Sequence, residues 1–463
     1  MLTVAYLANQ FPSAVEPYVG EEIEQLRRQG VRVIAGSVRK ARPSAEGGGN
    51  ECEAEIVMQP LRAIVLIRAV WLCIRRWNVI SDLIWRVIYR GHEGPLQRGK
   101  ALLHTWMGAC YAISLRGRGV EHIHVHHGYF GSWITMVAAR FLDIGFSITL
   151  HGSDLLLHGT YLDVKLENCS FCVTVSEYNR RFILDHYAGI DAEKVIVSRL
   201  GVEVREQADR RLDRQPDHGE FSILTIGRLH RVKDHAFLVR ACAQLHTRGV
   251  AFECSIAGEG PERRQLESLI RRCGLKERVT LLGHVPHEQM DSLYERADVV
   301  VLTSRSEGIP LVLMEAMARG KVVLAPAITG IPELVIRGQT GFLYEAGSMG
   351  DFVAQFLLIR SLMGSSSHPD LHRPYVLLAA RRLDWVRHAA QVQVRHNFNR
   401  DKNLASFSEL FIGRIARQAG NLLHENSVLQ QIQLPVQWNG DVPVRTDGTD
   451  AVAGARSSVV LDG

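Results

Sequence analysis

Short apolar runs with the composition of β-strands alternate with helix-like stretches along most of this 463-residue chain. In the first half the runs are residues 3–8, 31–37, 122–126, 147–151, 171–176 and 195–197. The pattern then restarts, with runs at residues 221–226, 252–257, 279–282, 299–302 and 322–325. Strands separated by helices predict a parallel sheet that is covered by helices on both faces. Two such series predict an α/β protein with two Rossmann-like domains.

The break between the two series sets the predicted domain boundaries. We expect the polar stretch 205–219 to link a first domain, residues 1–204, to a second domain, residues 220–350. Residues 351–422 have a helical pattern, and residues 423–463 have little periodicity, which predicts a disordered tail. Open α/β sheets bind ligands beyond the carboxyl ends of their strands, so the sequence predicts a binding cleft between the two domains.

Two glutamates, Glu307 and Glu315, stand eight positions apart around the predicted start of a helix. Gly308 ends the preceding loop, Pro310 suits the first helical position, and Gly320 suits the end of the helix. The N-terminus of a helix offers free N–H groups to a phosphate, and a nearby carboxylate suits sugar hydroxyls. Together these features predict a pocket for a phosphorylated sugar, in particular a sugar nucleotide.

This spacing resembles the E-x7-E signature of retaining glycosyltransferases of the GT-B fold, the large family 4 type. Further segments resemble motifs of that family in order and spacing. They are Gly227-Arg228-Leu229 with Lys233-Asp234, Gly258-Glu259-Gly260-Pro261, Gly283 with Ala297-Asp298, Thr329-Gly330-Ile331-Pro332-Glu333 with Gly341-Phe342-Leu343, His124-Val125-His126, and His151-Gly152-Ser153-Asp154. Residues 9–19 are similar to the F-P-x-x-x-E-x-[FY]-[VI] form of bacterial exopolysaccharide and capsule transferases. The resemblance covers roughly residues 1–415.

The resemblance implies a GT-B fold, in which two Rossmann-like domains face each other across a cleft and a C-terminal helix crosses back to the first domain. It also implies transfer of a hexose, with retention, from a nucleotide-sugar donor to a saccharide acceptor, which we expect to be lipid-linked, in polysaccharide biosynthesis. No cofactor is expected, because the nucleotide-sugar is a substrate. No D-x-D motif stands in a suitable place, so we expect no metal ion on the diphosphate.

Arg228 and Lys233 are the cations that we expect at a leaving nucleoside diphosphate, because fixed positive charge stabilises the charge that grows there. The resemblance gives the ribose hydroxyls to Glu315 and the hydroxyls of the transferred sugar to Glu307. The alternatives are ordinary solvated cations and, for Glu307, a partner of the helix dipole. The other donor-binding positions that the resemblance implies are Gly227, Gly258, Gly308, Ile309, Pro310 and Leu311.

His151 is expected beside the donor sugar or its phosphate, because it stands at a strand end in the H-G-x-D motif. Asp154 is expected to orient that loop, and His126 and His127 to line the acceptor side. A histidine-rich strand, residues 122–126, also raises the possibility of a metal site. We predict none, because zinc ligands usually come from more than one element.

Cysteine usage does not indicate a disulfide framework or a metal centre. Cys169 and Cys172 form a lone C-x-x-C with no second pair, and Cys172 falls in a strand-like run, where a core position is expected. Reduced thiols and an N-terminus that reads as a strand predict a cytoplasmic protein.

Residues 61–100 hold eight Lys and Arg against two acids, so this segment carries the whole positive excess of a chain with net charge +5. Concentrated charge of this kind does not indicate a nucleic-acid binder. Arginines interleaved with Trp and Ile favour contact with an anionic membrane surface, which would place the protein peripherally on the inner face of the cytoplasmic membrane. The alternative is an ordinary helix pair whose Arg stems cover apolar surface.

Three other functions were weighed against glycosyl transfer. A nucleotide-sugar 2-epimerase-like isomerase could use the same fold without an acceptor, and a non-catalytic homologue could keep the fold alone. Intact Arg228, Lys233, Glu307 and Glu315 argue against the non-catalytic protein. A dinucleotide dehydrogenase is disfavoured because no G-x-G-x-x-G follows the first strand.

Overall fold

The structure is a computed structural model of the 463-residue chain. It describes residues 1–13, 16–40, 53–91, 93–157, 159–204, 221–364 and 374–432; within these ranges the side chains of residues 287, 364, 374–380 and 419–432 are not described. The expected linker, residues 205–219, and residues 433–463 of the expected tail lie outside the described residues.

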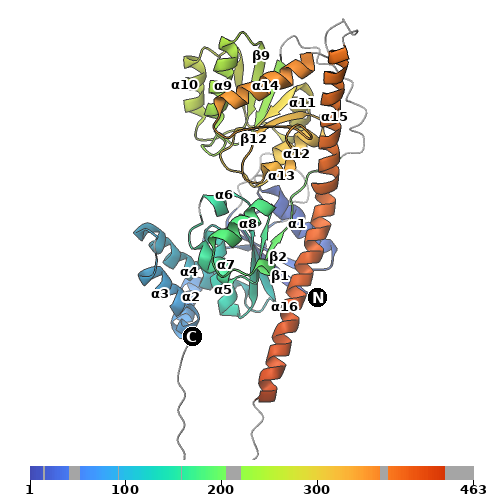
Figure 1. Cartoon of the computed structure of the whole chain (residues 1–463). Helices are drawn as coiled ribbons and strands as arrows, with labels where there is room; N and C mark the ends of the chain where they lie inside the picture. Colours follow the sequence, from blue (N-terminus) through green and yellow to red (C-terminus); the bar gives the residue numbers. More distant parts are fainter. Residues whose placement is uncertain are drawn as a thin grey trace, which may run out of the picture. The chain divides into compact units, whose positions relative to one another are not determined.

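The first half of the chain forms a seven-stranded sheet in which all pairings are parallel, in the order β3-β2-β1-β4-β5-β6-β7. Figure 1 labels β1 and β2 of this sheet among the helices of the first half. Its strands are β1 (Thr3–Gln10), β2 (Arg32–Arg39), β3 (Ile56–Val57), β4 (His122–His126), β5 (Gly145–Leu150), β6 (Phe171–Thr174) and β7 (Val195–Val197). The two-residue strand β3 was not expected, because it is too short to show a period.

The second half forms a six-stranded parallel sheet, in the order β10-β9-β8-β11-β12-β13. Its strands are β8 (Phe221–Ile226), β9 (Phe252–Ala257), β10 (Val279–Gly283), β11 (Val299–Val301), β12 (Val322–Pro326) and β13 (Phe342–Tyr344). The prediction of two parallel, Rossmann-like sheets is therefore confirmed.

Helices connect the strands, as parallel pairing requires. In the first half they are α1 (Pro17–Arg28), α2 (Ala63–Arg75), α3 (Trp77–Tyr89), α4 (Pro95–Leu115), α5 (Phe130–Leu142), α6 (Ser153–Leu156), α7 (Leu162–Asn168) and α8 (Glu177–His186), with a 3₁₀ turn at Ala192–Lys194. In the second half they are α9 (His235–Thr247), α10 (Arg263–Arg272), α11 (His287–Arg296), α12 (Leu311–Ala318), α13 (Ile331–Leu334), α14 (Met349–Gly364), α15 (Pro374–Asn397) and α16 (Arg400–Ile432). The insertion α2–α4 between β3 and β4 holds the predicted basic segment.

The long helix α16 returns to the first sheet, as expected. Phe407, Phe411 and Ile415 are buried in the core on one face of that sheet, and the ring of Phe411 lies 5.6 Å from the ring of Phe171. Residues 1–415 form one compact unit. The helix continues to Ile432, so residues 423–432, which we expected in the tail, are helical. No proline stops the helix before Pro435.

Candidate active site

Loops at the carboxyl ends of strands from both sheets meet at glycines. A Cβ atom on Gly152, after β5, would lie 2.8 Å from the backbone nitrogen of Gly308, after β11. A Cβ on Gly308 would overlap the carbonyl oxygen of His151. Only glycine fits such an approach. The H-G-x-D loop and the loop that carries Glu307 are therefore in direct contact.

The two charged residues that we expected on opposite parts of the donor are paired with each other. Lys233 Nζ lies 2.6 Å from Glu307 Oε1, and the side chains are 23% and 12% exposed. The stem of Lys233 passes over Gly227, whose Cβ would lie 3.5 Å from it. The two side chains therefore pair opposite formal charges in a partly buried place.

Arg228 differs from Lys233 in its surroundings. Its side chain is exposed, and among the described residues it has no hydrogen bond or ion pair. It follows Gly227, which packs against Gly258 of the neighbouring strand-end loop so closely that a Cβ on Gly258 would overlap the Gly227 carbonyl oxygen. Arg228 is thus a cation without an ionic partner among the described residues, whereas the nearby Lys233 is paired with Glu307.

Glu315 has a partner that the sequence did not reveal. The hydroxyl of Tyr294 in α11 donates to Glu315 Oε2 at 2.7 Å, and the guanidinium of Arg319 lies 4.6 Å from the centre of the Tyr294 ring. Tyr294 is fully buried, and its hydroxyl therefore fixes the carboxylate in one place. Residue Pro310 caps α12 rather than occupying its first turn, and the helix begins at Leu311. Gly320 ends it with φ of +67°, as expected.

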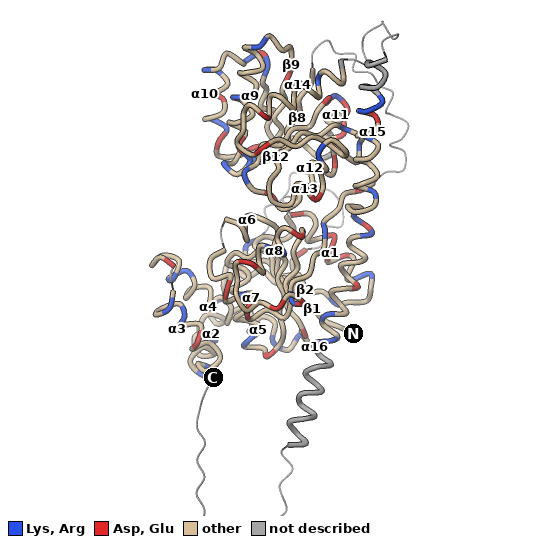
Figure 2. Tube along the Cα trace, in the orientation of Figure 1, with Lys and Arg blue, Asp and Glu red and all other residues tan. Residues whose placement is uncertain are grey.

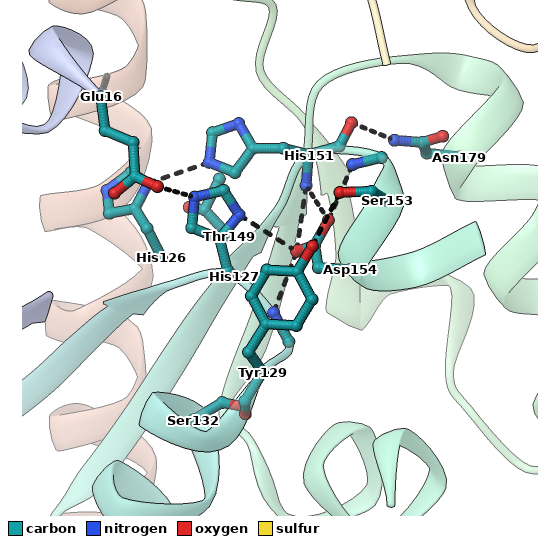
Figure 3. Close-up of polar contacts among 12 residues, drawn as sticks. Glu16, His126, His127, Tyr129, Ser132, Thr149, His151, Ser153, Asp154 and Asn179 are labelled. Atoms are coloured by element: carbon teal, nitrogen blue, oxygen red, sulfur yellow. Dashed lines mark hydrogen bonds and ion pairs between the residues drawn. The ribbon is translucent and has the colours of Figure 1, made fainter. Parts of the chain in front are cut away.

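Histidines from β4 and β5 form the other part of the site (Figure 3). His126 Nδ1 lies 3.1 Å from His151 Nε2, and the two rings are stacked with centres 5.4 Å apart. His127 turns the other way, with φ of +70°, and its ring lies between Glu16 at 3.0 Å and Asp154 at 3.6 Å. The three imidazoles are therefore neighbours with different partners.

The carboxylates on either side decide the charge of His127. Burial alone would lower the pKa of His127, but contacts with Asp154 and Glu16 outweigh it and raise that pKa to about 9. His127 is accordingly an imidazolium at neutral pH. For His151, burial is the largest cause, and with the nearby charge of His127 it holds the pKa well below the ordinary range. His151 is accordingly neutral.

Asp154 organises the loop around these rings. It is fully buried and accepts backbone N–H groups from Gly128 at 2.9 Å, Gly152 at 2.8 Å and His151 at 3.2 Å. Burial opposes its ionisation, but the contact with His127 and these hydrogen bonds lower its pKa overall. The Asp154 carboxylate thereby connects the turn after β4 to the loop after β5 through backbone hydrogen bonds.

His126 is not where we expected it. Its side chain is only 3% exposed, and it lies behind His151 rather than at an acceptor surface. The reason is that the imidazoles at 122, 124 and 126 point to one face of the sheet, where Phe411 of α16 lies 5.1 Å from His124 and Tyr18 of α1 lies 5.8 Å from His126. The sequence correctly predicts that the three side chains share one face of the strand, but it does not show which helices pack over that face.

One group of side chains in the described part of the chain has the spacing of metal ligands: Glu22, His124 and His126, whose ligand atoms lie within 4.8 Å of one another. Both nitrogens of His124 already have hydroxyl partners, Ser147 at 2.7 Å and Thr149 at 3.0 Å. His126 Nε2, in contrast, makes no hydrogen bond among the described residues. The group comes from two elements, α1 and β4, so our reason for predicting no metal site there was wrong. Cys169 and Cys172 are buried free thiols, and the core position predicted for Cys172 is confirmed.

Several residues of the site were missed by sequence reasoning. Glu22 and Tyr6 lie beneath the histidines, and Asn179 donates from Nδ2 to the His151 carbonyl at 3.1 Å. Glu333, in the T-G-I-P-E motif, accepts the backbone N–H groups of Glu177 at 3.1 Å and Tyr178 at 2.8 Å, at the start of α8. Glu333 belongs to a motif that resembles the family, but nothing in the sequence indicates that its partner is a helix of the first half.

Comparison with known proteins supports this architecture. Residues 207–363 match the family "Glycosyl transferases group 1". WcaL of Salmonella typhimurium, provisionally described as a colanic acid biosynthesis glycosyltransferase, is 36% identical over 177 residues, which cover 36% of this chain and 43% of WcaL. The amylovoran biosynthesis glycosyltransferase AmsK of Erwinia amylovora is 34% identical over 184 residues, covering 38% of this chain and 44% of AmsK. The chain therefore spans less than half the length of these relatives in alignment.

Solved structures match a larger share of the chain at lower identity. A sucrose-phosphate synthase from Thermosynechococcus elongatus has a TM-score of 0.65 and 18% identity, covering 90% of this chain and all of that one (100%). HepE of Anabaena, solved with UDP and glucose, has a TM-score of 0.59 and 18% identity, covering 89% and 100%. These likenesses confirm the GT-B fold that we expected.

Proposed function

We propose that the protein is a retaining glycosyltransferase of the family 4 type, which moves a hexose from a nucleotide-sugar donor to a saccharide acceptor in polysaccharide biosynthesis. The family match over residues 207–363 and the relatives named for exopolysaccharide synthesis support transfer to a saccharide. The UDP and glucose bound to HepE support a nucleotide-sugar donor.

The observation that carries the proposal is the arrangement of charge at the strand ends. Arg228, which has no ionic partner among the described residues, lies in the same loop as Lys233 of the Lys233–Glu307 pair. The loop that carries Glu307 contacts the His151 loop where Gly308 meets Gly152. A diphosphate would draw Lys233 and Arg228 to its oxygens, which frees Glu307 to accept from hydroxyls of the sugar. Fixed cations then stabilise the leaving nucleoside diphosphate. Glu315, held by Tyr294, would accept from the ribose hydroxyls.

Retention is proposed to follow a front-face route without a covalent intermediate. In this proposal neither Asp154 nor Glu307 serves as a nucleophile, because Asp154 accepts backbone N–H groups and Glu307, once released by Lys233, accepts from hydroxyls of the sugar. In this route the bond from the anomeric carbon to the diphosphate oxygen breaks while the acceptor oxygen bonds on the same face. The acceptor proton passes to the leaving diphosphate.

The test is a screen followed by a product analysis. Nucleoside diphosphates and sugar nucleotides are first ranked by the rise in melting temperature, because a ligand of the native state stabilises it. The best donor is then incubated with saccharide acceptors, and the anomeric configuration of the product is read by NMR. A product with the donor's configuration is expected. An inverted product would contradict retention, and a changed donor sugar without an acceptor would favour the isomerase.

We propose further that the acceptor is lipid-linked and that α2 and α3 contact the inner face of the cytoplasmic membrane. Four apolar side chains follow one face of α2 at helical spacing and are exposed by 56%, 71%, 57% and 70%: Ile64, Ile67, Trp71 and Ile74. The opposite face of α2 packs into the core through Ala69 and Leu72. A helix with apolar residues on both faces has more apolar surface than the fold needs.

Arginines occur along α2 and α3 (Figure 2). Arg75 lies over the ring of Trp71 at 5.0 Å, and Arg68 is exposed on the same helix. Arg76 and Arg86 have partners within the protein instead, the Phe141 carbonyl at 2.9 Å and Asp163 at 2.9 Å. No helix among the described residues is long and apolar enough to cross a membrane. The proposed contact is therefore interfacial.

A further inference from the structure

Three atoms that can bind a metal ion converge where α1 packs against β4. Glu22 Oε1 lies 3.3 Å from His126 Nε2 and 3.8 Å from His124 Nε2, and all three atoms lie within 4.8 Å of one another. The side chains of Glu22, His124 and His126 are 7%, 0% and 3% exposed. Two imidazoles and one carboxylate are a ligand set that zinc takes in other proteins. This Glu22–His124–His126 cluster therefore has the donors and the burial of a closed metal site.

One of the three atoms, His126 Nε2, lacks a hydrogen bond. It is buried and makes none among the described residues, although Glu22 Oε1 is 3.3 Å away. A hydrogen bond aligns the N–H with its acceptor, whereas two ligands of one ion stand side by side and both point at the ion. With bonds of about 2 Å, neighbouring ligand atoms of a tetrahedral zinc ion are about 3.3 Å apart. The spacing of His126 and Glu22 is thus that of two ligands of one ion.

The charge of Glu22 also favours a cation at this place. In the part of the chain that the structure describes, no Lys or Arg pairs with Glu22, and its carboxylate contacts the Tyr6 hydroxyl at 2.7 Å and the two imidazoles. Burying a carboxylate without a positive partner costs free energy. A divalent ion would supply the positive charge and would also accept the lone pair of His126 Nε2.

The other nitrogens of the two rings have the support that metal-binding histidines usually have. A histidine that binds an ion through Nε2 is held in orientation by a hydrogen bond at Nδ1. His124 Nδ1 lies 2.7 Å from Ser147 Oγ, and His126 Nδ1 lies 3.1 Å from His151 Nε2. The hydroxyl of Thr149 lies 3.0 Å from His124 Nε2, but a hydroxyl rotates to suit its partners. Both rings can therefore direct Nε2 at an ion.

We propose that Glu22, His124 and His126 bind one divalent transition-metal ion, with zinc as the best fit to the ligand set, and that this ion holds α1 against β4. The site is closed, so the role of the ion is structural. Helix α1 also carries Tyr18, whose ring lies 4.8 Å from the ring of His151. The ion would thus stabilise one side of the candidate active site. The inference is independent of the proposed glycosyl transfer.

The test is the metal content of the full chain, purified without a histidine tag. Because the site is closed, the ion enters during folding, so the protein is produced in medium with added Zn²⁺ or Co²⁺. We expect one ion per chain by elemental mass spectrometry, since the described residues hold one such cluster, and visible absorption of four-coordinate cobalt in the Co²⁺ protein. Protein with much less than one ion per chain from both media would overturn the proposal, because a proton on His126 would then balance Glu22.

Two variants locate the ion. His126→Gln removes one ligand nitrogen and should lose most of the metal, because even a partner outside the ligand shell is worth about 10–100-fold in metal affinity. His122→Gln is the matched control and should keep the ion. His122 is 1% exposed, lies two residues earlier on the same strand and is outside the cluster. Equal loss of metal in the two variants, or full metal content in His126→Gln, would overturn the assignment to these residues.

The melting temperature gives a second readout that needs no substrate. A ligand of the native state stabilises it, so the parent from zinc-supplemented medium should melt at least about 3 °C above the parent from zinc-depleted medium. This difference should be absent in His126→Gln. Equal melting temperatures of two parent preparations that differ in metal content would contradict the structural role. If the protein transfers no sugar, the proposed function fails, while these measurements still decide the inference.

Discussion

The two parts of the candidate site, one from each sheet, are built on opposite principles. The part after β8 and β11 consists of charged side chains, of which Arg228 is exposed and uncommitted. The part after β4 and β5 consists of mostly buried imidazoles and carboxylates that contact one another, from Glu22 to His151 and from Glu16 to Asp154. The first part is suited to meet a highly charged group, and the second to hold a neutral ring in one orientation.

The largest expected effect is on the exposed cation. Arg228→Ala should lower turnover by about 10²–10³-fold and leave the melting temperature unchanged, because it removes charge stabilisation of the leaving group without disturbing a packed contact. Steady-state kinetics with the best donor measures it. Arg231→Ala is the matched control, since Arg231 is in the same loop, is 84% exposed and should be dispensable. Similar activity of both variants would contradict the assignment.

The buried part should show itself in the pH dependence of stability. The pKa of His127 is about 9 in the folded protein and about 6.5 in an unfolded chain, so protonation of His127 favours the folded state. This contribution, about 3 kcal/mol, is fully present below pH ~6.5 and is lost as the pH rises toward ~9.

Urea unfolding between pH 6 and 10 measures the effect. His127→Gln should be less stable than the parent at pH 6 and should lose much less stability toward pH 9. His246→Gln, at an exposed position of α9, is the control and should follow the parent. A parent stability that is flat over this range would show that His127 is not held as an imidazolium.

Much of the first part could be predicted from the sequence, and little of the second. Arg228, Lys233, Glu307 and Glu315 lie in local motifs at strand ends, where chain order alone brings them near one another. Even here the ion pair of Lys233 with Glu307 and the hydroxyl of Tyr294 depend on side-chain packing. Motifs in the sequence do not show which of these side chains pair with one another.

The second part depends on contacts between elements far apart in the chain. Glu22 belongs to a surface-like run of acids in α1, and only the packing of α1 over β4 turns it inward. His126 is buried because Tyr18 and Glu22 of α1 lie against it, whereas α16, from the far end of the chain, covers His124 on the same face. The alternation of side chains along the strand correctly predicts which face of β4 carries the histidines. It does not predict which helices pack on that face.

The two glutamates of the first part should separate two kinds of binding. Glu315→Gln should weaken binding of nucleoside diphosphate by about tenfold, since a charged acceptor binds hydroxyls more strongly than a neutral one. Glu307→Gln should leave that binding within a few-fold and lower sugar transfer. Isothermal calorimetry with the nucleoside diphosphate alone makes the comparison. Equal losses in the two variants would contradict the division between ribose and sugar.

The smallest effect per residue is expected at the membrane. Arg68→Gln, Arg75→Gln and Arg90→Gln together should release the protein from vesicles of anionic lipid, at about 1 kcal/mol per residue, and added salt should weaken the parent's binding. Co-sedimentation measures both. Arg76 and Arg86 are left intact, because their contacts are internal. Failure of the parent to bind these vesicles at low salt would contradict a membrane role for α2 and α3.

The central claim is that the two parts of the site divide the donor between them, the diphosphate to Arg228 and the sugar to His151. The direct test compares nucleoside diphosphate affinity with sugar transfer in two variants. His151→Ala should bind nucleoside diphosphate as the parent does and transfer sugar at least about tenfold more slowly. Arg228→Ala should lose both. A His151→Ala protein that loses diphosphate binding as severely as Arg228→Ala would contradict the account.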